Sequence, residues 1–259
     1  MHQPANGKNI FADKATLILR KMLPDPQKKW VTRDFTGENG VSLGMAQGVL
    51  ETLAKKGYIE RVKRGPDSYA LLTNRDALIK DWLAEYRFEL NKVDTYYSPD
   101  KNVLSRIKDY LKDKPYALTL HSGANLRTSF VITDQVHLYF ESENWKKDIL
   151  ELRQQLDLKE LVRGGNVHIV RPVYKKSIFY GARTIKGYKV VSDLQLYLDL
   201  YNFKPRGREQ AEYLKEAKVP HQLALYEGVL HGFLHYSAVE PRAMRAIEEG
   251  AEFLRALPA

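Results

Sequence analysis

The sequence contains no cysteine and no long hydrophobic run. The absence of cysteine excludes a disulfide framework and any metal site that is built on thiolates. No stretch approaches the roughly 20 apolar residues that a membrane-spanning helix needs. The first residues, MHQPANGKNIFADK, lack the apolar core of a secretory signal. We therefore expect a cytoplasmic protein without a membrane partner, whose 259 residues can form one large domain or two small ones.

The whole chain carries a net charge of +9, and its positive charge is concentrated in the first five-sixths. Residues 1–85 hold 14 basic and 10 acidic residues, residues 86–215 hold 23 and 16, and residues 216–259 hold 4 and 6. Basic proteins often bind polyanions, because counterions released from phosphates favour binding. The charge therefore favours a nucleic-acid partner and a chain divided into domains 1–85, 86–215 and a tail 216–259.

The sequence of the first domain predicts three helices followed by a β-hairpin. Apolar residues at helical spacing predict a helix over residues 12–23, which the run Pro24-Asp25-Pro26 ends. Thr32 can cap a short second helix that Gly40 ends. Ser42 can cap a third helix that runs to Gly57. Two short strands then flank a turn at Gly65-Pro66-Asp67.

This order of elements predicts a winged helix-turn-helix, in which the third helix enters the major groove of DNA by its N-terminal end. We expect an apolar stripe of Leu43, Ala46, Val49, Leu50 and Leu53 to face the core. The residues expected to face the bases are Ser42, Gly44, Met45, Gln47 and Gly48. Gln47 can bind adenine bidentately, and the glycines allow a close approach. Phosphate contacts are expected from Lys28, Lys29, Arg33, Lys55, Lys56, Arg61, Lys63 and Arg64. The alternative is a winged helix that makes protein contacts alone.

The segment Gly40-Val-Ser-Leu-Gly44 also has the G-x-S-x-G spacing of a hydrolase nucleophile. A nucleophile elbow needs a buried strand directly before it, because the strained strand-to-helix turn exposes the serine. The residues before Gly40, TRDFTGEN, are polar and predict no strand. We therefore interpret Ser42 as a helix cap.

The sequence of the middle domain predicts alternating helices and strands, which indicate a layered α/β or α+β fold. We expect helices within residues 76–92, 99–114, 145–158 and 192–202, and strands within 129–142 and 165–174. A further strand from Tyr116 is expected to run into a glycine turn at Gly123. His121, His137 and His168 are isolated in the sequence and are interpreted as core or surface residues. The strand after Gly123 offers only Asp134, Glu141 and Glu143 to a metal, so we expect no active site, cofactor or metal.

Three stretches of residues 28–215 resemble AbiEi-family antitoxins, the transcriptional regulators of type IV toxin–antitoxin systems. They are VSLGMAQGVLETLAKKGYI, YALTLHSGANL and, most specifically, VVSDLQLYLDLYNFKPRGREQAEYL. The resemblance implies a winged-helix domain that binds inverted repeats in its own promoter. It also implies a degenerate nucleotidyltransferase-like domain that counteracts a separate nucleotidyltransferase toxin. By that likeness, the second domain's segment is marked by Gln195, Tyr197, Asp199, Arg206, Gly207, Arg208 and Glu209, in structural roles.

The tail resembles the C-terminal end of hormone-sensitive-lipase-like α/β-hydrolases, where the histidine of His-Gly-Phe, here His231, is the triad base. A triad also needs a nucleophile elbow and an oxyanion loop, and the chain has neither. We therefore expect a short β-α tail without catalytic function.

The sequence as a whole predicts an α+β, non-enzymatic, DNA-binding transcriptional repressor and antitoxin. Its expected partners are promoter DNA with inverted repeats, a nucleotidyltransferase toxin and a second copy of the chain. The alternatives are an esterase that uses His231 and a regulator whose middle domain senses a small ligand.

Overall fold

The computed structural model describes residues 9–216, apart from residues 38, 39, 129, 130, 132, 162 and 205. The described residues up to Leu214 belong to one compact unit. The expected β-α tail and its His231 lie outside the described residues.

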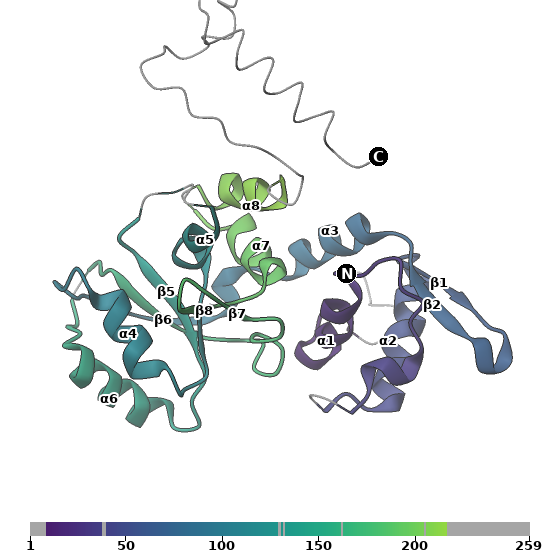
Figure 1. Ribbon diagram of the computed structural model, residues 1–259, viewed down its shortest axis with the longest axis horizontal. Helices are drawn as coiled ribbons and strands as arrows, with labels where there is room; N and C mark the ends of the chain where they lie inside the picture. The colour runs from purple at the N-terminus through teal and green to yellow at the C-terminus, as the bar shows by residue number, and fades with distance from the viewer. Residues whose placement is uncertain are drawn as a thin grey trace, which may run out of the picture. The chain divides into compact units, whose positions relative to one another are not determined.

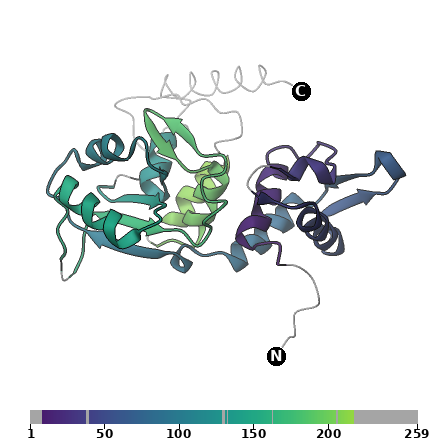
Figure 2. The same ribbon diagram turned by 90° about the horizontal axis from the view of Figure 1, so that it is seen from below.

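The N-terminal part has the expected order of helices and hairpin (Figures 1 and 2). Its elements are α1 (Asp13–Met22), the 3-10 helix η1 (Thr32–Phe35), α2 (Leu43–Lys55), β1 (Ile59–Val62), the 3-10 turn η3 (Gly65–Asp67) and β2 (Tyr69–Leu72). The two strands are antiparallel, with Ile59 opposite Leu72. Trp30 adds a short bridge to this hairpin, because it exchanges backbone hydrogen bonds of 2.9 and 2.8 Å with Ala70.

The two predicted helix caps of this part have different outcomes. Ser42 caps α2 as expected, since its Oγ accepts a hydrogen bond from the Met45 backbone N–H at 3.2 Å. The expected cap at Thr32 is wrong. The Trp30 bridge is followed by extended backbone at Val31, which becomes the N-cap, and the Asp34 carboxylate accepts the Val31 N–H at 2.9 Å. This short helix ends at Phe35 and does not reach Gly40.

The second part is a mixed six-stranded sheet covered by helices, and the predicted α+β class is confirmed. The elements before the sheet's centre are α3 (Arg75–Glu85), the 3-10 helix η4 (Phe88–Leu90), β3 (Lys92–Tyr96), α4 (Val103–Leu111), β4 (Tyr116–Leu118) and α5 (Leu120–Thr128). Those that follow are β5 (Val136–Phe140), α6 (Trp145–Leu156), β6 (Val167–Arg171), β7 (Arg183–Ile185), β8 (Tyr188–Val190), α7 (Asp193–Tyr201) and α8 (Gly207–Glu216).

The strand order in this sheet is β3-β6-β5-β4-β8-β7. The pairs β5–β6 and β4–β8 are parallel, and the other pairs are antiparallel. Helices α4 and α6 lie on one side of the sheet, and α5 and α7 lie on the other (Figure 1). Among the described residues, no helix has both the length and the apolar composition that a membrane span requires.

Two sequence predictions in the second part are wrong in detail. The helix expected to reach residue 92 ends at Glu85, because Tyr86 has an extended backbone and directs its side chain into the core. The glycine turn expected at Gly123 is a helix, α5. A Cβ at Gly123 would lie 3.0 Å from the Leu118 carbonyl oxygen and from a Leu196 methyl group, so the glycine allows α5 to pack closely on its neighbours. The β7–β8 hairpin was not predicted.

Helix α1 joins the N-terminal part to the second part. Its residues from Ala15 to Arg20 are all buried. The Asp13 carboxylate accepts the backbone N–H groups of Lys176 (2.8 Å) and Ser177 (2.9 Å). The Thr16 hydroxyl donates to the Ser177 hydroxyl at 2.8 Å. The expected boundary at residue 85 coincides with the end of α3 and stays a prediction, since buried contacts cross between the two parts.

Candidate nucleic-acid interface

Helix α2 has one buried face and one exposed face. Ala46, Val49, Leu50 and Leu53 are buried, as the apolar stripe predicts. Leu43, which was expected in the same stripe, is 54% exposed. Leu43 is the first residue of the helix and is not among its buried residues. It therefore belongs to the exposed face.

The residues that were expected to face the bases divide between the two faces. Ser42, Gly44 and Gln47 are exposed, and Gly48 is partly exposed. Met45 is partly buried and packs against the hydrophobic core. The exposed face of α2 is therefore rotated from the one that the sequence predicted, towards Leu43 and away from Met45.

An acidic residue that sequence reasoning missed lies on this exposed face. Glu51 follows Gln47 by four residues and accepts a hydrogen bond from the Gln47 side-chain amide at 3.4 Å. The Glu51 carboxylate also lies 3.9 Å from the Arg61 guanidinium on β1. The sequence contained a signal for this contact, because Gln47 and Glu51 are four residues apart on a predicted helix and such residues are neighbours on one face. Its negative charge repels phosphates, and its contact with Arg61 occupies a cation that could bind one.

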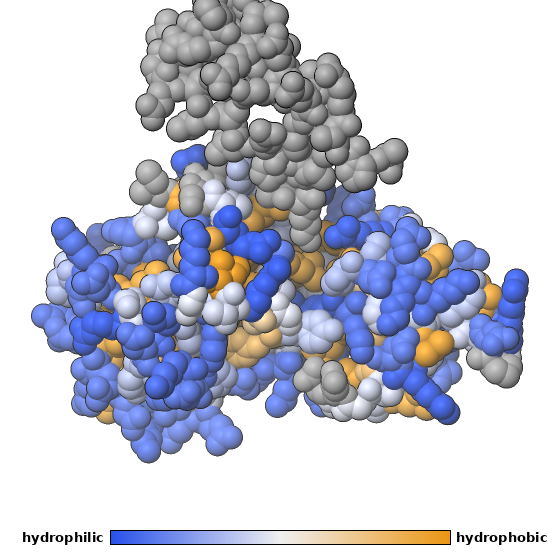
Figure 3. Space-filling model, in the orientation of Figure 1, coloured by the Kyte–Doolittle hydropathy of each residue, from blue (hydrophilic) through white to orange (hydrophobic). Residues whose placement is uncertain are grey.

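The cations expected to contact phosphates lie around α2 and the hairpin. Arg61 is partly buried. The other seven are exposed: Lys28, Lys29, Arg33, Lys55, Lys56, Lys63 and Arg64. The Lys28 ammonium lies 4.2 Å from the centre of the Trp30 ring, and that of Lys29 lies 4.9 Å from the Tyr69 ring. Such contacts restrain these two charges beside the hairpin. Figure 3 shows one mostly hydrophilic face of the molecule, with small hydrophobic areas.

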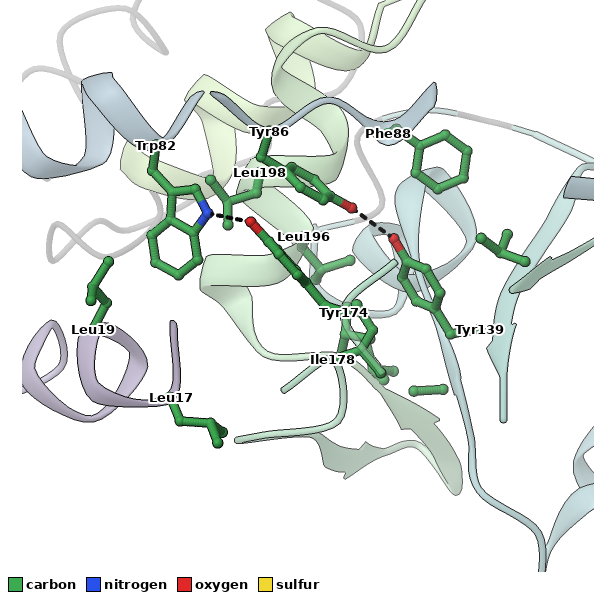
Figure 4. Close-up of a cluster of buried hydrophobic side chains, with 14 of the residues drawn as sticks. Leu17, Leu19, Trp82, Tyr86, Phe88, Tyr139, Tyr174, Ile178, Leu196 and Leu198 are labelled. Atoms are coloured by element: carbon green, nitrogen blue, oxygen red, sulfur yellow. Dashed lines mark hydrogen bonds between the residues drawn. The ribbon is translucent and has the colours of Figure 1, made fainter. Parts of the chain in front are cut away.

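Two residues of the second predicted set, Gln195 and Asp199 of α7, belong to a buried polar network. Figure 4 shows two tyrosines of this network, Tyr86 and Tyr139, whose hydroxyl groups lie 3.1 Å apart. The Asp199 Oδ1 accepts hydrogen bonds from the Tyr86 hydroxyl (2.7 Å), the Tyr139 hydroxyl (2.9 Å) and the Gln195 Nε2 (2.7 Å). The Thr119 hydroxyl donates to Oδ2. Burial raises the pKa of Asp199 to about 6, although these hydrogen bonds lower it.

Gln195 connects this carboxylate to a buried arginine of α1. Its Oε1 accepts a hydrogen bond from the Arg20 Nη2 at 2.6 Å. The Arg20 guanidinium also lies 5.2 Å from the Trp82 ring and 5.6 Å from the Tyr174 ring. Burial lowers the pKa of Arg20, and the nearby Asp199 opposes that effect. The network therefore holds two buried charges of opposite sign and joins α1 to α7.

The other side chains of the predicted segment lie where α7 turns into α8; Arg206, Arg208 and Glu209 are exposed, and Tyr197 is half-buried. The Tyr197 hydroxyl donates to Glu212 at 3.4 Å, and the Arg206 Nε donates to Glu209 at 3.0 Å. The Arg208 Nη2 donates to the Tyr201 hydroxyl at 2.9 Å. The contacts of Tyr197 and Arg208 connect α7 to α8, and the contact between Arg206 and Glu209 lies at the start of α8.

Gly207 has a steric role at the same turn. A Cβ at this position would collide with the Leu200 carbonyl oxygen. The described contacts of Gln195, Tyr197, Asp199, Arg206 and Arg208 are made within the chain, and the structural role of the segment stays a prediction.

The three histidines of the second part are closer in space than their sequence positions suggested. The rings of His137 and His168 stack, with their centroids 4.2 Å apart. Burial, reinforced by His168 and His121, lowers the pKa of His137 to about 3. Within the described part of the chain, no group of three or more histidine, aspartate or glutamate residues could hold a metal ion.

The described residues bear on two other hypotheses from the sequence, a hydrolase and a ligand sensor. The 3-10 helix η1, and not a strand, is the element before Ser42, so the G-x-S-x-G segment lacks an elbow. One cavity is lined in part by α1 and another in part by the hairpin. Each has a volume of about 30 Å³, which is room for one or two water molecules. The histidine of the esterase hypothesis, His231, lies outside the described residues.

The fold is that of an α+β protein in which a helical module with a β-hairpin is joined to a mixed-sheet module. A family sequence model described as "Transcriptional regulator, AbiEi antitoxin, Type IV TA system" matches residues 71–219, more than half of the chain. The chain therefore belongs to the AbiEi antitoxin family of transcriptional regulators. The match does not include residues 28–70, where part of the resemblance was expected, and it gives no support to the hydrolase-like tail. No curated protein and no solved structure gives a significant match.

Proposed function

We propose that residues 9–72 form a winged helix-turn-helix that binds promoter DNA. The N-terminal half of α2 enters the major groove, and the loop of the hairpin lies against the sugar-phosphate backbone. The observation that carries this proposal is the exposed face of α2, which begins beside the Ser42 cap and is flanked by exposed cations. The family description supports the proposal, because a transcriptional regulator of this kind acts on DNA.

Gln47 is the residue proposed to read a base by hydrogen bonding. Its amide can pair bidentately with adenine N6 and N7. To do so it exchanges its 3.4 Å hydrogen bond to Glu51 for one to the base. The bond is long and exposed, so the exchange costs little. Gly44 and Gly48 carry no side chain, which leaves room for the groove floor on either side of Gln47.

The exposed cations supply sequence-independent affinity. Each phosphate contact steepens the dependence of log K on log salt by about 0.9. If all eight expected cations bound phosphates, the slope for one protomer would reach about −7. The contact between Arg61 and Glu51 makes a smaller slope the expected result.

Repression follows from occupancy of the promoter, so the proposed function needs no catalysis. A single small module gives limited specificity, which favours two copies of the chain on an inverted repeat. The second part, with its mixed sheet, is proposed to meet a nucleotidyltransferase toxin. That role rests on the family resemblance.

Arg64→Ala tests the proposed orientation of the hairpin. Fluorescence anisotropy would measure binding to a duplex from upstream of the gene over a series of KCl concentrations. We expect Arg64→Ala to weaken binding to every duplex and to reduce the salt slope by about 0.9. Arg87→Ala is the matched control, because Arg87 is an exposed arginine between α3 and η4, outside the proposed DNA-binding residues 9–72. Equal slopes for the two variants would contradict the proposal.

A further inference from the structure

The first residue of α2 is a large apolar side chain that the core does not use. Leu43 is 54% exposed and lies between the exposed residues Ser42 and Gly44. Single exposed leucines are common on protein surfaces, so exposure alone decides nothing. The position of Leu43 on the helix gives the exposure a meaning.

Leu43 lies on the same face of α2 as Gln47, one turn nearer the N-terminus. Residues four apart on an α-helix are neighbours on one face. Their separation along the axis is about 6 Å, which corresponds to roughly two base-pair steps. Leu43 and Gln47 are both exposed, and Gly44, which follows Leu43, has no side chain. A helix placed with Gln47 against a base therefore also brings Leu43 to the groove floor.

We infer that Leu43 is a specificity residue that contacts the C5-methyl group of a thymine in the major groove. Thymine presents the only methyl group among the four unmodified bases in this groove. The polar edge of any other base would lose water against Leu43 without gaining a hydrogen bond. With Gln47 on adenine, the inference predicts two A·T pairs about two base pairs apart in each half-site. This inference rests on the proposed DNA-binding function.

The test begins with selection of the tightest-binding sequences from a library of random duplexes by the full chain. We expect an enriched motif with a fixed thymine. Replacing that thymine by deoxyuridine removes one methyl group, and we expect the Kd to rise about fourfold. Leu43→Ala should bind the thymine and deoxyuridine duplexes equally well, while it still prefers the adenine that Gln47 reads.

Leu150→Ala is the matched control variant, because Leu150 of α6 is 52% exposed and the substitution is the same. It should keep the fourfold penalty. An equal deoxyuridine penalty for the wild type and Leu43→Ala would overturn the inference and leave the proposed function standing. An enriched motif without a fixed thymine would also overturn the inference and leave the proposed function standing.

Three further results would also overturn the inference. Equal weakening by Leu43→Ala on all duplexes, or a change in its oligomeric state by sedimentation, would assign Leu43 to folding or self-association. Failure of the wild type to enrich any motif would overturn the proposed function itself, and the inference with it. Circular dichroism of each variant identifies a loss of fold.

Discussion

The substitution Asp199→Asn should change how stability depends on pH. The Asn Oδ1 can accept the hydrogen bonds that Tyr86, Tyr139 and Gln195 give to the carboxylate. The Asn Nδ2 can donate to the Thr119 hydroxyl, because a hydroxyl also accepts hydrogen bonds. The variant can therefore keep the geometry of the network while it removes the titrating group.

The magnitude follows from the pKa of Asp199, which burial raises from 3.8 to about 6 in the folded protein. A raised carboxyl pKa means that folding takes up a proton. Proton uptake increases the free energy of unfolding below pH 3.8 by about 3 kcal/mol, relative to its value well above pH 6. This contribution is lost as the pH rises through 6. At pH 5, one unit below the folded pKa, it is about 1.4 kcal/mol.

The assay is urea unfolding at pH 7.5 and pH 5.0, followed by the fluorescence of Trp82 and the other tryptophans. The free energy of unfolding of the wild type, relative to Asp199→Asn, should increase by about 1.4 kcal/mol on acidification. His137 has a pKa lowered to about 3, so its contribution is lost as the pH falls below 6.5. Both proteins contain His137, and the comparison removes its effect.

Asp109→Asn, at an exposed position of α4, controls for the substitution itself. Curves for the wild type and Asp199→Asn that stay parallel between the two pH values would refute the reasoning. They would mean that Asp199 stays ionised in the folded protein over this range.

The remaining predictions concern the exposed face of α2. Gln47→Ala should reduce the preference for one adenine by about 1–3 kcal/mol, as measured by competition between duplexes that differ at that base pair. Unchanged discrimination at every base pair would assign Gln47 to the surface alone. Glu51→Gln should tighten binding to scrambled duplex, because it removes a repulsive charge and releases Arg61 for a phosphate. Anisotropy over a KCl series should then show a salt slope steeper by about 0.9, and a slope equal to that of the wild type would contradict this account.

The order of elements in the N-terminal part could be predicted because local signals define it. Apolar spacing, the proline run after α1, the Ser42 cap and the turn at Gly65 all agree with the structure. The sequence does not define which side of α2 is exposed, because Leu43 and Met45 are both apolar. Only the shape of the core decides that Met45 packs inside and Leu43 does not.

The polar network could not be predicted because its members come from distant parts of the chain. Arg20 lies in a run of apolar residues, and nothing in the sequence names Gln195 and Asp199 of α7 as its partners. The end of α3 depends on the same network, since Tyr86 leaves the helix and reaches Asp199. One signal was available: α1 is apolar on more than one side, which indicates a helix packed between two layers.

The central claim is that α2 reads the bases of the promoter. The most direct measurement compares binding of the full chain to the duplex upstream of its own gene with binding to a scrambled duplex of equal length and composition. The account predicts a preference of about a hundredfold or more, with a steep salt dependence on both duplexes. Weak and equal binding to the two duplexes would contradict it, and would assign the exposed face of α2 to a protein partner.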